Sequence, residues 1–214
     1  MKSCIIFCAG GFAGLAAPIE KDDYIIAADG GLSHTAALGL TPNAVLGDFD
    51  SLGYTPENAI LFPVEKDDTD AMLAVRHGLE KGYKTFCLYG TLDGPRVDHT
   101  VANLQTLQFL ADRGATGYLI GTTQIATLLQ NGKLSFPEGC NGTISVFCFG
   151  EDAEGVTLEG LHYPLEKGRL TAGFPLGVSN HFTGKPTTIS VEKGTLLVIY
   201  DRCAGFPEEV GYEG

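Results

Sequence analysis

Basic residues are scarce in this chain: Lys and Arg number 14 against 26 Asp and Glu, so the formal net charge is −12 at pH 7. Proteins that bind nucleic acid or an anionic membrane need a basic surface, so this balance predicts no nucleic-acid partner and no membrane partner. Trp is absent, and no apolar run reaches the roughly eighteen residues of a membrane-spanning helix.

Cysteine is present, but no Cys-x-x-Cys pair occurs among the six residues. A chain of 214 residues that is 44% hydrophobic can bury a core without disulfides. We therefore expect reduced thiols in a cytoplasmic protein. The segment from Lys2 to Ala17 is similar in composition to a signal peptide. The Gly10-Gly11 break and the strand-like run Cys4–Ala9 favour a first core strand instead.

The first part of the chain alternates strand-like apolar runs with helix-like periodicity, which predicts an α/β domain with a mostly parallel sheet and flanking helices. The expected buried side of the last helix, which ends at Gly114, is Val101, Leu104, Leu107 and Ala111. The expected strands are 3–9, 24–28, 43–46 and 84–89, and the other expected helices are 32–38 and 70–81.

From Lys133 onward the helical periodicity disappears. Short apolar runs, such as 143–149 and 196–200, alternate with turn residues and frequent glycines, which predicts an all-β sandwich-like domain. We therefore expect two domains that join near Asn131-Gly132: an α/β catalytic domain, which binds nucleotide and metal, over 1–132 and a β-sandwich domain over 133–214.

Two acidic stretches carry the main functional signal. Asp48 and Asp50 follow a strand-like run, and residues two apart in an extended segment point the same way. The second stretch, 66–70, opens a helix, whose N-terminus favours anions. Carboxylate oxygens suit Mg²⁺, which commonly binds one or two carboxylates together with substrate phosphates. The stretches predict a metal-dependent site for nucleotide phosphates; Asx turns and helix N-caps are the alternatives.

Other candidates lie at the expected strand ends. Asp29 ends a strand and is followed by two glycines, where open α/β sheets place ligands. The glycine-rich stretch 9–14 suits a loop that approaches phosphate, and Arg96 suits a bidentate grip on phosphate. A plain turn, a helix N-cap and a surface His99 remain the alternative interpretations. In the β half, Ser179 and Asn180 lie among small and aromatic residues, which suits either a hydrogen-bonding loop or a simple turn.

Together these segments resemble the thiamine pyrophosphokinase (thiamin diphosphokinase) family over nearly the whole chain. The resemblance rests on five motifs in this order: Ala28-Asp29-Gly30-Gly31, Gly47-Asp48-Phe49-Asp50-Ser51, Lys66-Asp67-Asp68-Thr69-Asp70, Arg96-x-Asp98-His99 and Val178-Ser179-Asn180. The family implies a homodimer with the active site at the subunit interface. It also implies Mg²⁺-dependent transfer of the β,γ-pyrophosphoryl group of ATP to thiamine, which releases AMP.

The resemblance implies a role for each matching residue. Asp48, Asp50 and Asp70 would surround Mg²⁺ and the triphosphate, and Asp98 completes the catalytic set. Ser179 and Asn180 would hold the thiamine pyrimidine, from the partner subunit. The residues expected to bind ATP are Asp29, Ser51, Lys66, Thr69, Arg96 and His99.

This chain departs from the family in the loop before Arg96, where Pro95 fixes φ and removes a backbone donor. Because Trp is absent, an aromatic wall for thiamine must come from Phe or Tyr, with Phe174 and Phe182 as the candidates. Two alternatives stay open: a pyrophosphokinase of the same scaffold that acts on another alcohol, such as a pterin, and a protein that binds thiamine or nucleotide without chemistry.

Overall fold

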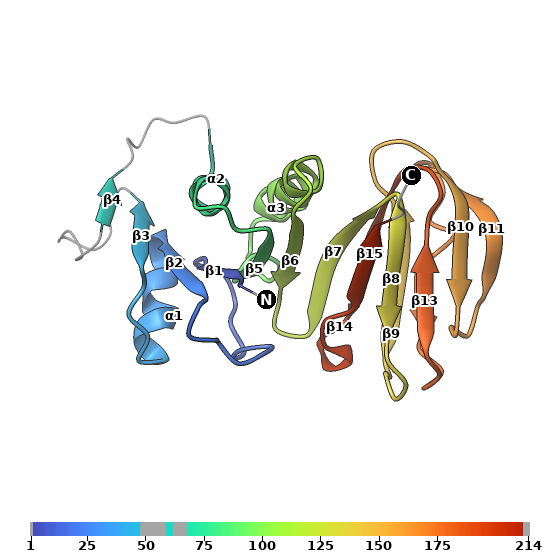
Figure 1. Ribbon diagram of the computed structural model, residues 1–214, viewed down its shortest axis with the longest axis horizontal. Helices are drawn as coiled ribbons and strands as arrows, with labels where there is room; N and C mark the ends of the chain where they lie inside the picture. The colour runs from blue at the N-terminus through green and yellow to red at the C-terminus, as the bar shows by residue number, and fades with distance from the viewer. Residues whose placement is uncertain (1, 48–58, 62–67, 212–214) are drawn as a thin grey trace. The chain divides into compact units, whose positions relative to one another are not determined.

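The computed structural model describes residues 2–47, 59–61 and 68–211. The chain divides into two compact units between Thr122 and Thr123 (Figure 1). No helix within the described residues has the length and apolar character that a membrane crossing requires.

The first unit is built on a parallel sheet in which the described strands follow the order β6-β5-β1-β2-β3-β4. Their side chains are mostly buried, as expected of strands covered on both faces. The strands are β1 Cys4–Phe7, β2 Tyr24–Ala28, β3 Ala44–Gly47, β4 Ala59–Leu61, β5 Thr85–Tyr89 and β6 Thr116–Ile120. Four of them, β1, β2, β3 and β5, agree with the expected strands to within two residues, and the α/β class is confirmed.

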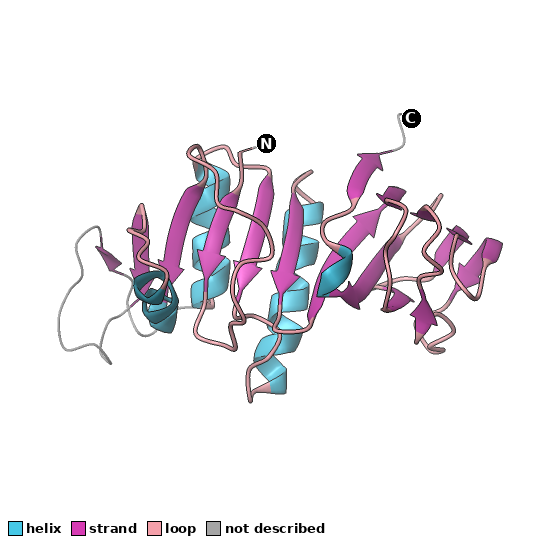
Figure 2. Cartoon of the chain, turned by 90° about the horizontal axis from the view of Figure 1, so that it is seen from below, coloured by secondary structure: helices cyan, strands magenta, loops and turns pink. Residues whose placement is uncertain are grey.

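Three α-helices are described in this unit: α1 Leu32–Ala37, α2 Asp70–Glu80 and α3 Val97–Ala111. Figure 1 shows α2 and α3 on one face of the sheet and α1 on the other, and Figure 2 shows the same layers from below. A short 3₁₀ turn, Asp29–Gly31, connects β2 to α1.

The expected buried side of α3 is wrong at Val101, which is 51% exposed. The face that is buried carries Asn103, Thr106, Leu107 and Leu110. Gly117 on β6 explains this rotation, because a Cβ there would lie 2.7 Å from the side chains of both leucines. Because Gly117 has no side chain, Leu107 and Leu110 of α3 pack directly against its backbone.

The order of the strands creates a topological switch point between β1 and β5. Strands β2 to β4 extend to one side of β1, whereas β5 and β6 lie on the other side. Ligands of open α/β sheets bind beyond the carboxyl ends of the strands at such a point. The segments that follow β1 and β5 stay paired beyond the ends of the strands, because Gly10 N donates to the Gly90 carbonyl at 3.0 Å. A Cβ on Gly10 would collide with that carbonyl oxygen, so a larger residue does not fit this approach.

The second unit is a β-sandwich of antiparallel sheets, as expected for the C-terminal part. One sheet has the order β12-β9-β14-β7 and the other β11-β10-β13-β8-β15. Phe136 of β8 packs edge-on against Tyr200 of β14, with ring centroids 5.0 Å apart, and so joins the two sheets. The strands are β7 Gln124–Gln130, β8 Gly132–Phe136, β9 Thr143–Cys148, β10 Ala153–Glu159, β11 Leu165–Leu170, β12 Asn180–His181, β13 Thr187–Ser190, β14 Thr195–Asp201 and β15 Glu208–Gly211, and a 3₁₀ turn spans Arg202–Ala204.

Strand β7 decides where the units divide. It pairs with β14 along its whole length and therefore belongs to the second unit. The sequence analysis placed β7 in the first domain, because its apolar run continues the texture of the α/β half.

Candidate active site

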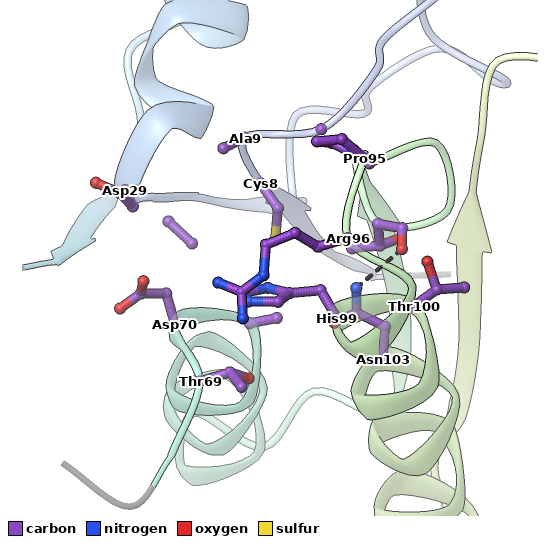
Figure 3. A pocket seen from close by; sticks show the side chains of 16 residues that line it. Cys8, Ala9, Asp29, Thr69, Asp70, Pro95, Arg96, His99, Thr100 and Asn103 are labelled. Atoms are coloured by element: carbon purple, nitrogen blue, oxygen red, sulfur yellow. Dashed lines mark hydrogen bonds between the residues drawn. The ribbon is translucent and has the colours of Figure 1, made fainter.

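A pocket of about 310 Å³ opens at the switch point of the first unit, beyond the carboxyl ends of β1 and β5. The N-termini of α2 and α3 reach the same place (Figure 3). Five of the residues expected to bind ATP or metal line it: Asp29, Thr69, Asp70, Arg96 and His99.

Local backbone structure places both acids at this edge of the sheet. Asp29 directly follows β2 and has a left-handed φ of 47°, a conformation that Asp tolerates better than most residues, and the chain turns there toward α1. Asp70 is the first residue of α2, after the N-cap Thr69, whose hydroxyl accepts a hydrogen bond from Met72 N at 3.2 Å. Figure 3 shows Asp29 and Asp70 on one side of the pocket, with Arg96 and His99 extending from the other.

The thiol of Cys8 lies on the pocket floor just after β1. Burial, together with the nearby carboxylates of Asp70 and Asp29, raises the pKa of this thiol to about 12. The thiol is therefore neutral at physiological pH. Asp29 and Asp70 line the same pocket as this thiol.

Arg96 is held by Asp98, two residues later at the start of α3. Arg96 Nε lies 3.2 Å from one carboxylate oxygen and Nη2 lies 2.6 Å from the other. This pairing lowers the pKa of Asp98 and raises that of Arg96. Arg96 lines the pocket, whereas Asp98 does not.

Asp68, the acid before the N-cap of α2, has a different partner. Its carboxylate lies 2.8 Å from Nε of Arg76, and the Arg76 guanidinium in turn lies 4.7 Å from the centre of the Phe109 ring on α3. The two acids at the start of α2 therefore have different roles. Asp70 lines the pocket, whereas Asp68 binds Arg76, which packs on Phe109 of α3.

Four expected site residues, Asp48, Asp50, Ser51 and Lys66, lie outside the described residues. Their proposed roles in metal and phosphate binding stay predictions.

The two candidates in the second unit differ in exposure. Ser179 is exposed and has a left-handed φ of 57°, and its N–H donates to Ser145 Oγ at 3.0 Å. Asn180 is only 3% exposed. Its Oδ1 accepts hydrogen bonds from the N–H groups of Tyr163 and His181, and its Nδ2 donates to the Tyr163 carbonyl at 2.7 Å. Among the described residues, these bonds use three of the four hydrogen-bonding positions of the Asn180 amide, and one N–H is left.

The aromatic candidates are also separated by burial. Phe182 is 7% exposed and packs edge-on against Phe136, so the expectation that it forms a ligand wall is wrong. Phe174 is 65% exposed and Tyr163 is 63% exposed. Tyr163, which the sequence analysis did not select, borders an apolar pocket of about 140 Å³ together with Asn180.

The sequence analysis also missed Cys8 and Asn103, both of which line the pocket of the first unit. The signal for Cys8 was its place directly after the first strand. The signal for Asn103 was a polar residue four positions before Leu107, on what proved to be the buried face of a helix.

The arrangement suits a polyanionic ligand that is bound with a metal ion. Two helix N-termini and the Arg96 guanidinium favour phosphate groups. Two carboxylates in the same space repel a free polyanion, but they supply hard oxygen ligands for a divalent cation between them and the phosphates.

Comparison with known proteins gives the same family for both units. A model of "Thiamin pyrophosphokinase, catalytic domain" matches residues 15–118, and one of "Thiamin pyrophosphokinase, vitamin B1 binding domain" matches residues 132–196. The thiamine pyrophosphokinase of Bacillus subtilis (strain 168) is 31% identical over 170 residues, which are 75% of this chain and 79% of that protein.

Solved structures agree with these sequence matches. The crystal structure of thiamine pyrophosphokinase from Bacillus subtilis has a TM-score of 0.82 and 28% identity, and the match covers 94% of this chain and 99% of that one. The structure of thiamin pyrophosphokinase from Geobacillus thermodenitrificans has a TM-score of 0.78 and 25% identity, with 94% and 97% covered.

Proposed function

Since the chain belongs to the thiamin pyrophosphokinase family, we propose that it transfers the β,γ-pyrophosphoryl group of ATP to the hydroxyethyl oxygen of thiamine. The products are thiamine diphosphate and AMP. The observation that carries this proposal is the pocket at the switch point, where Asp29 and Asp70 face Arg96 and His99. Pyrophosphoryl transfer needs mainly positioning and charge neutralisation, and these groups are of the types that supply both.

In this proposal the triphosphate lies between the two groups of side chains. Arg96, His99 and the N-termini of α2 and α3 contact phosphate oxygens, together with Lys66. Asp29 and Asp70 fit Mg²⁺ because both are carboxylates that line one pocket, and Asp48 and Asp50 complete the set of ligands. When it is bound, Mg²⁺ neutralises charge on the phosphates.

The thiamine hydroxyl must lose a proton as it attacks. Asp98 is a poor acceptor, because its pairing with Arg96 lowers its pKa and leaves it a weak base. We therefore assign proton acceptance to Asp70, which lines the pocket at the start of α2. Asp98 instead holds the Arg96 guanidinium.

Ser179 and Asn180 are proposed for the thiamine end. The exposed hydroxyl of Ser179 is available to the pyrimidine, and Asn180 supports the Tyr163 main chain. Thiamine is cationic, so the acidic protein suits it. We also propose a homodimer with the active site at the subunit interface. Three exposed large apolar side chains that border the same pocket as Asn180 support an interface there: Tyr163, Leu176 and Val178.

A cytoplasmic location is proposed on the cysteines. All six thiols are free in the structure: Cys4, Cys8, Cys87, Cys140, Cys148 and Cys203. Free thiols persist in a reducing compartment, which is also where ATP is abundant.

The test is chromatography of the products formed from ATP and thiamine, with Mg²⁺ and with EDTA. We expect equal amounts of AMP and thiamine diphosphate, and no product in EDTA. ADP in place of AMP would replace the reaction class with phosphoryl transfer. Turnover of a pterin alcohol but not of thiamine would favour the second acceptor, and calorimetric binding without AMP would favour a binding protein.

A further inference from the structure

Asn103 is a polar residue on the buried face of α3. It is 9% exposed, and the residues four and seven positions later on the same face are the core side chains Leu107 and Leu110. A carboxamide in such a place lowers stability unless its polar atoms find partners. The identity of its partner therefore indicates why Asn stands here.

The partner is the loop between β5 and α3. Asn103 Nδ2 donates to the Thr91 carbonyl oxygen at 2.8 Å, the dashed bond in Figure 3. The Thr91 hydroxyl donates in turn to the Leu88 carbonyl at 2.9 Å, and Thr91 is 4% exposed. The Thr91 side chain thus binds the end of β5, and the Thr91 main chain binds α3.

The segment that follows this anchor forms one wall of the pocket. Gly94, Pro95 and Arg96 line the pocket and are exposed, and they lie in no helix or strand. Among the described residues, one further hydrogen bond holds 91–95: the Asp93 carboxylate accepts it from Thr122 N. Because the loop is buried at Thr91 and exposed at Arg96, its path depends on how firmly Thr91 is held.

We propose that Asn103 is a positioning residue for nucleotide binding: it holds Thr91, and with it the 91–96 loop, so that Arg96 faces the phosphates. This inference rests on the proposed function. Asn suits the task because its amide nitrogen donates to a carbonyl, which neither Asp nor an apolar residue of similar size can do. It acts through Arg96, since its side chain donates a hydrogen bond to the loop that carries Arg96.

The principal test replaces Asn103 with Leu, which keeps the number and branching of the side-chain heavy atoms but removes the donor. The matched control is Thr106→Val on the same buried face, because in the described part of the chain Thr106 Oγ1 donates within α3, to the Ala102 carbonyl at 3.0 Å. We expect Asn103→Leu to raise KM for ATP about tenfold, with kcat and KM for thiamine changed less than about twofold. Thr106→Val should leave all three near wild type.

A double-mutant cycle with Arg96→Ala separates action through the loop from direct contact. If Asn103 acts through Arg96, Asn103→Leu should change ATP binding by less than about twofold in the Arg96→Ala background. If the losses of ATP affinity in Asn103→Leu and Arg96→Ala multiply in the double variant, the proposal is overturned. An unchanged KM for ATP in Asn103→Leu would also overturn it. An equal loss in Thr106→Val would assign the effect to α3 as a whole.

Hydrogen exchange gives a readout that is independent of turnover. Amide exchange in 91–96 should accelerate in Asn103→Leu, and in Asn103→Ser if the Leu variant does not fold, while β6 stays protected. Unchanged exchange would refute the tether. Wild-type protein without ATP binding would disprove the proposed function instead, and the exchange result would still decide whether Asn103 holds the loop.

Discussion

The carboxylate of Asp98 accepts two hydrogen bonds from a single guanidinium, that of Arg96, with Nε at 3.2 Å and Nη2 at 2.6 Å. Both side chains are 65% exposed, so water screens the pair and its value for stability is small. The pair instead fixes the orientation of the Arg96 guanidinium. Asp98 uses two of the five N–H groups of Arg96, and in the described part of the chain the other three are available to phosphate.

Asp98→Asn is therefore expected to weaken ATP binding by about three- to tenfold and to leave the pH dependence of kcat unchanged. The pKa of Asp98 is lowered by Arg96, so the pair is intact at neutral pH and is lost only as pH falls through that lowered value. Initial rates across a pH series check this. A shift of the acid limb in Asp98→Asn would identify Asp98 as the base after all.

Asp70→Asn is expected to lower kcat about a thousandfold while the fold survives, because it removes a carboxylate from the pocket. The matched control is Asp68→Asn, two residues earlier, whose partner is Arg76. That variant should keep its kcat within about threefold. Circular dichroism confirms folding, and product chromatography measures turnover. Equal losses in the two variants would point to the start of α2 as a whole.

Gly10→Ala is expected to reduce ATP affinity by about tenfold or more. The new Cβ collides with the Gly90 carbonyl and must separate the two segments that follow β1 and β5. The control is Gly39→Ala, where the Cβ meets open space but φ is +66°. That change should lower stability by about 1 kcal/mol and leave ATP affinity unaltered. Calorimetry and thermal melts distinguish the two effects. Wild-type affinity in Gly10→Ala would show that this approach does not shape the pocket.

Asn180→Ala is expected to raise KM for thiamine about tenfold and to leave KM for ATP unchanged. It removes three hydrogen bonds and leaves the Tyr163 main chain without its partners, so the melting temperature should also fall. Asn141→Ala is the control, since Asn141 is exposed and its side chain donates only to the nearby Gly139 carbonyl in the described contacts. If Asn180 contacts thiamine directly, its loss should add to that of Tyr163→Ala, whereas support through Tyr163 makes the two effects overlap.

Local patterns were enough for the architecture and for much of the pocket. Apolar runs predicted the parallel strands, and turn-rich texture predicted the β-sandwich, because burial on one or two faces imposes a periodicity that the sequence records. Asp29 and Asp70 could be placed at one edge since parallel strands end together and the following helices begin there. Arg96 followed from the same rule.

Local sequence patterns alone were therefore sufficient to predict the class of each unit, the family, and the edge of the sheet where Asp29 and Asp70 lie. Tertiary structure alone decided which face of α3 is buried, because Gly117 on a distant strand receives Leu107 and Leu110. It also decided that Asn180 is committed to Tyr163 and that Asn103 is committed to Thr91. The physical reason is common to these cases: the partner lies on another segment, and hydrogen bonds and close packing between segments leave no periodic trace in the sequence.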